Sequence, residues 1–439
     1  MLKAAKGAAL AAALAFASSA FAAPPPPEYV QFSGAAKGAL YRPDPALFPS
    51  AHVGVVVMHR NSNFLSHIST RELPQRGFVV LGMNPRCDNN EAACTPWENN
   101  ALDVRQGVNH LRTRVPGITK VILLGHSGGG PTMSFYQAVA ENGAAFCQQP
   151  EKLMKCSGSG FSTLLRADGI ILMDAHPGNG INAVRSIHPG VTNDAEILKH
   201  NHEPKVDWKL DPFDPRNGYR DDGTTLYTEE FKQKAFKAQS QRMNELIDEA
   251  LAHLAEVQAR GDVDAAFIVP MADNARMADI DLGIHRSTVQ NRKLVRNDGT
   301  IVSDRPVESV RLANLRDGDQ EGFGATMFLT LRSFLSVRAV RSTTSMDGIV
   351  WCSSNNSTNC NLQQVTVPLL VTAMGAHYFI RDSEVFFDMA ASADKDFYVI
   401  EGATHGGGTC TACETTPGQY SNATKNLFDL MRDWMNARF

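Results

Sequence analysis

The chain has 439 residues, of which 43% are hydrophobic and 20% charged, and its formal net charge is −4 at pH 7. This balance is typical of a globular protein with a large core. Proteins that bind nucleic acids or anionic membranes usually have an excess of basic residues, whereas this chain has a slight excess of acidic ones. Neither class of partner is therefore expected.

The first 22 residues have the parts of a secretory signal. Lys3 and Lys6 precede an apolar stretch that ends in the small-x-small sequence Ala20-Phe21-Ala22. A membrane anchor is the alternative, but this run is shorter than the ~20 apolar residues that a span needs. We expect cleavage after residue 22 and export to the periplasm or the exterior. The loss of two lysines then changes the formal charge from −4 to −6.

Strand-like and helix-like segments alternate from residue 53 onward. Short apolar runs are typical of strands buried on both faces, and they occur at 53–59, 77–84, 120–125, 168–174, 367–375 and 396–402. Helical segments are expected over 66–76, 97–114 and 131–140, and at the C-terminus over 422–439. The alternation predicts an α/β fold with a mostly parallel central sheet and helices on both faces.

The regular alternation of short strands and helices is interrupted between residues 179 and 349. Thr228 is placed to cap a long helix over 229–257, and turn-rich sequence surrounds it. Because core strands resume afterwards, we expect a mainly helical cap, 179–349, inserted between core segments 23–178 and 350–439. An independent domain is the alternative. The cap's aromatic residues favour an apolar or aromatic substrate and include Trp208, Phe213, Tyr219 and Tyr227.

Eight cysteines in an exported chain predict disulfides. Their spacing favours four local bridges, each within one surface loop: Cys87–Cys94, Cys147–Cys156, Cys352–Cys360 and Cys410–Cys413. A zinc site at Cys410 and Cys413 is the alternative, but no second CxxC or paired histidine supplies the remaining ligands. No metal or other cofactor is predicted.

The strand at 120–125 leads into Gly125-His126-Ser127-Gly128-Gly129, a G-x-S-x-G sequence at a strand-to-helix junction. Small residues two positions before and after the serine permit a sharp, strained turn that exposes its hydroxyl above the sheet. The N–H of Gly128 would face the negative charge that develops on a substrate oxygen. A phosphate-binding loop is the alternative, but Pro131 replaces the lysine it would need. Ser127 is therefore the predicted nucleophile.

Four stretches resemble the α/β-hydrolase superfamily over most of the mature chain. They are "VVVMHRNSN", "LLGHSGGG", "GIILMDAHPG" and "VIEGATHGGG". The family orders its triad as nucleophile, acid and histidine along the chain. The resemblance implies that His405, after the last strand, is the general base. It also implies an oxyanion hole formed by the N–H groups of Gly128 and Asn61, although Arg60 stands where the family has glycine.

The triad acid departs from the commonest pattern of this family. Many members place an Asp after the next-to-last core strand, where this chain has His377 and Tyr378. Asp174 ends the strand before it, a position that some members use, and Asp174 is the predicted acid. A longer loop could bring Glu384 or Asp382 to the histidine instead, and both remain alternatives.

The predicted function is hydrolysis of a small-molecule carboxylic ester through an acyl-enzyme. A peptidase or amidase with the same triad is one alternative. An acidic ring that binds a free amino terminus would mark it, and Glu229, Glu230 and Asp248 are available in the cap. The other alternative is a noncatalytic binding protein, since fold does not fix function. The sequence does not indicate the oligomeric state.

Overall fold

The computed structural model describes residues 25–87, 95–200, 202–272, 276–312 and 326–439. Six strands match the six apolar runs of the sequence, and eight more are short. In chain order the strands are β1 (Glu28–Gln31), β2 (Lys37–Tyr41), β3 (Val53–Met58), β4 (Val79–Asn84), β5 (Lys120–His126), β6 (Gly169–Met173), β7 (Ala266–Pro270), β8 (Ser287–Asn291), β9 (Lys293–Val295), β10 (Ile301–Val302), β11 (Pro306–Glu308), β12 (Thr326–Thr330), β13 (Leu369–Met374) and β14 (Lys395–Ile400). The predicted signal lies outside the described residues.

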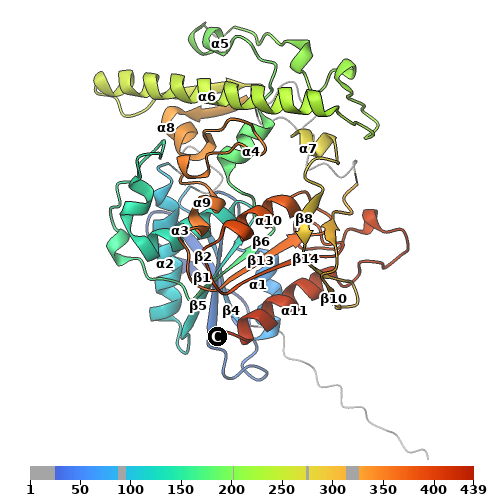
Figure 1. Cartoon of the computed structure of the whole chain (residues 1–439). Helices are drawn as coiled ribbons and strands as arrows, with labels where there is room; N and C mark the ends of the chain where they lie inside the picture. Colours follow the sequence, from blue (N-terminus) through green and yellow to red (C-terminus); the bar gives the residue numbers. More distant parts are fainter. Residues whose placement is uncertain (1–24, 88–94, 201, 273–275, 313–325) are drawn as a thin grey trace, which may run out of the picture.

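A ten-stranded sheet forms the centre of the molecule, in the order β1-β2-β4-β3-β5-β6-β13-β14-β9-β10 (Figure 1). Neighbours from β4 to β9 in this order are parallel. The pairs at the two edges, which involve β1, β2 and β10, are antiparallel. The mostly parallel sheet confirms the fold class predicted from the sequence.

Helices cover both faces of the sheet and form the cap above it (Figure 1). They are α1 (Ile68–Glu72), α2 (Glu98–Arg114), α3 (Gly129–Asn142), α4 (Asn179–Ser186), α5 (Asp194–His200), α6 (Glu229–Ala259), α7 (Met277–Ile280), α8 (Leu331–Ser333), α9 (Thr358–Leu362), α10 (Ile380–Met389) and α11 (Ala423–Asn436). Apolar residues of α2, α3 and α10 pack on one face of the sheet. Those of α11 pack on the other. The strands are therefore buried on both sides, which explains their continuous apolar runs.

The cap has its own core, formed where α6 packs with α4, α8 and the two-stranded sheet of β7 and β12. The side chain of Thr228 accepts a hydrogen bond from the N–H of Phe231, so the helix cap expected from the sequence is present. The helix extends over 31 residues and lies across the top of the molecule in Figure 1. No helix in the described parts of the chain is long and apolar enough to cross a membrane.

Two strands within residues 179–349 belong to the central sheet, which the sequence did not indicate. β9 pairs in parallel with β14, and β10 pairs with β9, so this segment also widens the central sheet. These strands span three and two residues and are mostly half-exposed or exposed. Because they lack an apolar run, the pattern that revealed the core strands did not reveal them.

Three of the four predicted cysteine pairs are bonded: Cys147–Cys156, Cys352–Cys360 and Cys410–Cys413. In the fourth predicted pair, Cys94 lies outside the described residues. Local bridges between cysteines three to nine residues apart fit an oxidising compartment.

Candidate active site

The sheet topology gathers the predicted triad at one edge. β5, β6, β13 and β14 are consecutive neighbours and parallel, so their carboxyl ends meet at the same edge. Ser127 follows β5, Asp174 follows β6, and His405 lies in the loop after β14. The carboxyl edge of a parallel α/β sheet is where such folds place their ligands.

The turn at Ser127 has the backbone strain expected of a nucleophile elbow. Its φ is +53°, which few residues other than glycine adopt. A Cβ on Gly125 would lie 2.5 Å from the carbonyl oxygen of Gly129, and one on Gly129 would lie 2.8 Å from that of Met58. The glycines are therefore needed where the turn brings backbone segments together.

Asp174 contacts the predicted base directly. His405 Nδ1 lies 2.6 Å from Asp174 Oδ2, and the N–H of Met374 donates to Oδ1 at 3.1 Å. The carboxylate is fully buried, whereas the His405 side chain is 28% exposed. Burial alone would raise the pKa of Asp174, but contacts with His377 and His405 outweigh it and hold this pKa well below its usual range. The aspartate is therefore charged and oriented toward the imidazole.

The two alternative acids are bonded elsewhere. Both carboxylate oxygens of Asp382 accept hydrogen bonds from Arg185, at 3.0 and 2.9 Å. Glu384 accepts from the backbone N–H groups of Val289 and Gln290, at 2.8 and 2.9 Å, and pairs with nearby arginines. Of the three acids considered, the structure brings Asp174 to His405.

His126, next to the nucleophile, ties the elbow to the loop of His405. Its Nε2–H donates to the backbone oxygen of His405 at 2.8 Å, and the two rings lie 4.7 Å apart. Because Nε2 donates, Nδ1 of His126 accepts from His67 Nε2, at 2.9 Å. Burial lowers the pKa of His67 to about 4 and that of His126 well below its ordinary value. Two neutral histidines therefore hold the base loop against the elbow.

The predicted oxyanion loop after β3 is arranged around His59. Nδ1 of His59 accepts from the N–H groups of Asn61 and Ser62, at 3.3 and 3.1 Å. Burial lowers the pKa of His59 to about 3, so Nδ1 stays an acceptor. In this state the Asn61 N–H makes a long internal hydrogen bond, which a substrate oxygen would have to replace. The oxyanion roles of Asn61 and Gly128 stay predictions.

His377 is a further residue of this site, and the sequence did not assign it a role. Its Nδ1 lies 2.7 Å from Asp174 Oδ2, and its ring stacks on that of His405 with centroids 4.3 Å apart. Asp174 and the two histidines thus have the composition of a metal site. Ligands of a tetrahedral zinc ion stand about 3.3 Å apart, given Zn–N distances of about 2.0–2.1 Å. The Nδ1 atoms of His377 and His405 instead lie 2.7 and 2.6 Å from a single carboxylate oxygen, which is closer than zinc ligands stand to one another.

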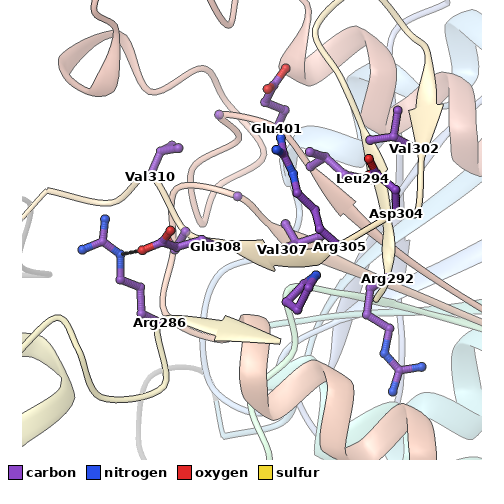
Figure 2. A pocket seen from close by; sticks show the side chains of 14 residues that line it. Arg286, Arg292, Leu294, Val302, Asp304, Arg305, Val307, Glu308, Val310 and Glu401 are labelled. Carbon is purple, nitrogen blue, oxygen red and sulfur yellow. Dashed lines mark ion pairs between the residues drawn. The ribbon is translucent and has the colours of Figure 1, made fainter. Parts of the chain in front are cut away.

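A pocket of about 420 Å³ lies beside the loops that follow β13 and β14 and is shown in Figure 2. Gly375 and Gly402, which follow β13 and β14, form part of its wall. The labelled side chains include charged groups, and the ion pair between Arg286 and Glu308 closes one side at 2.7 Å. Ser127, Asp174 and His405 do not line this pocket, so it is separate from the triad.

The disulfide Cys410–Cys413 lies directly after the loop that carries His405. The N–H of Cys410 donates to the Gly402 oxygen at 2.9 Å, and Ala403 bridges to Thr409. These backbone contacts close the loop of His405, and the disulfide holds Cys410, which makes one of them.

We expect the double substitution Cys410→Ser and Cys413→Ser to lower kcat roughly tenfold, because small misplacement of a catalytic group is costly. The measurement is turnover of an ester by the folded variant. Cys147→Ser with Cys156→Ser removes a bridge away from this loop, between cysteines nine residues apart, and should retain kcat. Equal activity of both double variants would contradict a role for the loop bridge.

No protein-family model matches the chain, and no curated protein matches it in sequence. Several solved structures align with most of this chain. One is monoglyceride lipase from Saccharomyces cerevisiae, which is 14% identical over 95% of this chain and 96% of its own, with a TM-score of 0.39. Proline iminopeptidase from Mycobacterium smegmatis has 13% identity, 94% and 98% coverage, and a TM-score of 0.36. An α/β-hydrolase superfamily protein from Enterococcus faecalis has 11% identity, 94% and 99% coverage, and a TM-score of 0.37. Similarity at this level leaves the activity to be argued from the site.

Proposed function

We propose that this chain is an exported serine hydrolase of the α/β-hydrolase fold that cleaves a carboxylic ester with Ser127, His405 and Asp174. The observation that carries the proposal is the 2.6 Å contact between His405 Nδ1 and the buried carboxylate of Asp174, beside the strained turn at Ser127. An isolated histidine near a serine is a weak signal. A histidine oriented by a charged, buried acid is the arrangement that activates a serine.

The first half of the reaction acylates the enzyme. Ser127 Oγ attacks the ester carbonyl carbon, and its proton passes to Nε2 of His405. The new C–O bond gives a tetrahedral intermediate, whose negative oxygen would be bound by the N–H groups of Gly128 and Asn61. Asp174 stabilises the imidazolium that forms. The bond to the alcohol oxygen then breaks, and the alcohol takes the proton from Nε2.

The second half of the reaction releases the acid. A water molecule gives a proton to His405 Nε2 and attacks the acyl carbon. The bond from that carbon to Ser127 Oγ breaks, the proton returns to Oγ, and the free carboxylic acid leaves. The chain's own residues carry every proton in this scheme.

The charges of the cap favour an ester over a peptide with a free amino terminus. Glu230 pairs with Lys234 at 2.7 Å, and Asp248 pairs with Arg341 at 2.5 Å. Glu229 pairs with Lys232. Each acid proposed for an amine-binding ring is thus neutralised by its own neighbour. The bonded cysteines support export.

We expect the mature protein to hydrolyse p-nitrophenyl acetate and to leave alanine p-nitroanilide intact. The ester needs only the triad, whereas the anilide also needs a site for its amino group. Release of p-nitrophenol and p-nitroaniline, followed by absorbance under identical conditions, measures both rates. Rapid anilide hydrolysis would favour the peptidase alternative. If neither substrate is hydrolysed and Ser127 resists an active-site probe, the noncatalytic alternative gains support.

A further inference from the structure

The two nitrogens of the His59 imidazole have different surroundings. Nδ1 accepts from the backbone N–H groups of Asn61 and Ser62, at 3.3 and 3.1 Å. A ring nitrogen that accepts hydrogen bonds carries no proton, so the single proton of the neutral imidazole is on Nε2. Nε2 makes no hydrogen bond with the described residues, and 9% of the His59 surface remains exposed. His59 therefore has one N–H donor that the protein does not use.

This unused donor lies against the residue that follows the nucleophile. A Cβ on Gly128 would stand 2.3 Å from His59 Nε2, which is too close for any side chain. At the φ of −65° found at Gly128, the N–H bond and the direction of a Cβ are nearly eclipsed. Nε2 of His59 and the N–H of Gly128 are therefore on the same side of the elbow, where glycine leaves room for the imidazole.

Donors placed in this way suit a negative oxygen. An oxyanion hole is built from N–H groups about 2.7–3.1 Å from the developing charge, and histidine side chains serve as such donors beside backbone N–H groups. The N–H of Asn61 is already directed to His59 Nδ1, at 3.3 Å. A substrate oxygen that took this N–H would break that bond, whereas the Nε2–H of His59 can donate without breaking any contact.

The ring of His59 is held in this orientation before any substrate binds. Two backbone N–H groups bond to Nδ1, and the ring of Phe64 packs beside it with centroids 5.2 Å apart. Burial, aided by the charge of Arg60, lowers the pKa of His59 to about 3, so the imidazole stays neutral. Donors that are fixed in advance stabilise a developing charge strongly, because they need no reorganisation during the reaction.

We propose that His59 is a catalytic residue that donates Nε2–H, together with the N–H of Gly128, to the oxyanion of the tetrahedral intermediate. The carbonyl oxygen gains negative charge when Ser127 Oγ adds to the carbon and loses it when the C=O bond re-forms, and the proton stays on Nε2 throughout. In this assignment the N–H of Asn61 holds the ring of His59 and does not bind the substrate. The inference rests on the proposed function, since it concerns the same reaction.

Two substitutions separate the Nε2 donor from the loop contact at Nδ1. His59→Asn retains an oxygen near the position of Nδ1, which can accept from the loop, but has no group at the position of Nε2. His59→Gln places its amide NH₂ near the position of Nε2 and loses the acceptor for the loop. His52→Asn is the matched control, because His52 directly precedes β3 at the opposite end of the same strand, and it should retain wild-type activity.

The test compares kcat/KM for p-nitrophenyl acetate with kcat/KM for its thionoester, in which sulfur replaces the carbonyl oxygen. Sulfur is a weak acceptor, so loss of an oxyanion donor slows the ester more than the thionoester. We expect His59→Asn to lower kcat for the ester by about 10²–10³ with little change in KM, and to lower the ester-to-thionoester ratio by about tenfold or more. His59→Gln should keep this ratio within roughly threefold of the wild-type value.

The ratio is measured on the folded fraction alone, so partial unfolding does not imitate the expected effect. If His59→Asn does not fold, Gly128→Ala replaces it, because the new Cβ displaces Nε2 and leaves the backbone N–H of residue 128 in place. The inference is overturned if the variant tested has the wild-type ratio, or if the ratio falls equally in His59→Gln. Failure of the wild-type protein to hydrolyse either substrate would instead contradict the proposed function, so the two failures are distinguishable.

Discussion

Asp174→Asn is expected to lower kcat for an ester by about 10⁴, with little change in KM. The amide has no negative charge to stabilise the imidazolium, and its NH₂ group would favour the wrong tautomer of His405. In the wild-type protein His405 Nδ1 lies 2.6 Å from the carboxylate, so the change acts directly on the base. Initial rates at saturating ester, with the Tm of the variant, measure the effect.

Glu384→Gln is the matched control for this prediction. Glu384 is a buried carboxylate near the same sheet edge, but its oxygens accept from Val289 and Gln290. The control should lower Tm and leave kcat close to the wild-type value. Near-normal turnover by Asp174→Asn together with a large loss in Glu384→Gln would transfer the acid role to Glu384.

Ser127→Ala is expected to have the largest effect, a loss of about 10⁶ in kcat, which is the scale found when a serine nucleophile is removed. The substitution deletes one oxygen and leaves the elbow backbone in place, so the fold should persist. Steady-state ester hydrolysis measures the loss after correction for the uncatalysed rate. Ser159→Ala, at an exposed position, is the matched control and should retain full activity. Comparable activity in the two variants would exclude Ser127 as the nucleophile.

The core strands and the elbow could be predicted from local sequence. β3 and residues 121–125 of β5 are apolar runs because both faces of these strands are covered, so that consecutive side chains are buried. Gly125 and Gly129 signal the turn because any side chain there would collide with backbone. Burial of a strand and close backbone contact at a turn both restrict the residue types of one short segment, so both can be recognised in its sequence.

The contacts of His377 could not be predicted in this way. Residues 174, 377 and 405 meet because β6, β13 and β14 are neighbours in the sheet, and their order is not encoded in any one segment. For the same reason the sequence left Glu384 and Asp382 open as acids. β9 and β10 escaped notice because edge strands of two or three residues carry no apolar period.

The central claim, an activated serine at position 127, is tested most directly by intact mass after treatment with a fluorophosphonate. The account predicts a single adduct on the folded, oxidised wild-type protein and none on Ser127→Ala. An adduct requires a base that removes the serine proton, so it reports on Ser127 and His405 together. No adduct on the wild-type protein, or an equal adduct on the alanine variant, would contradict the account.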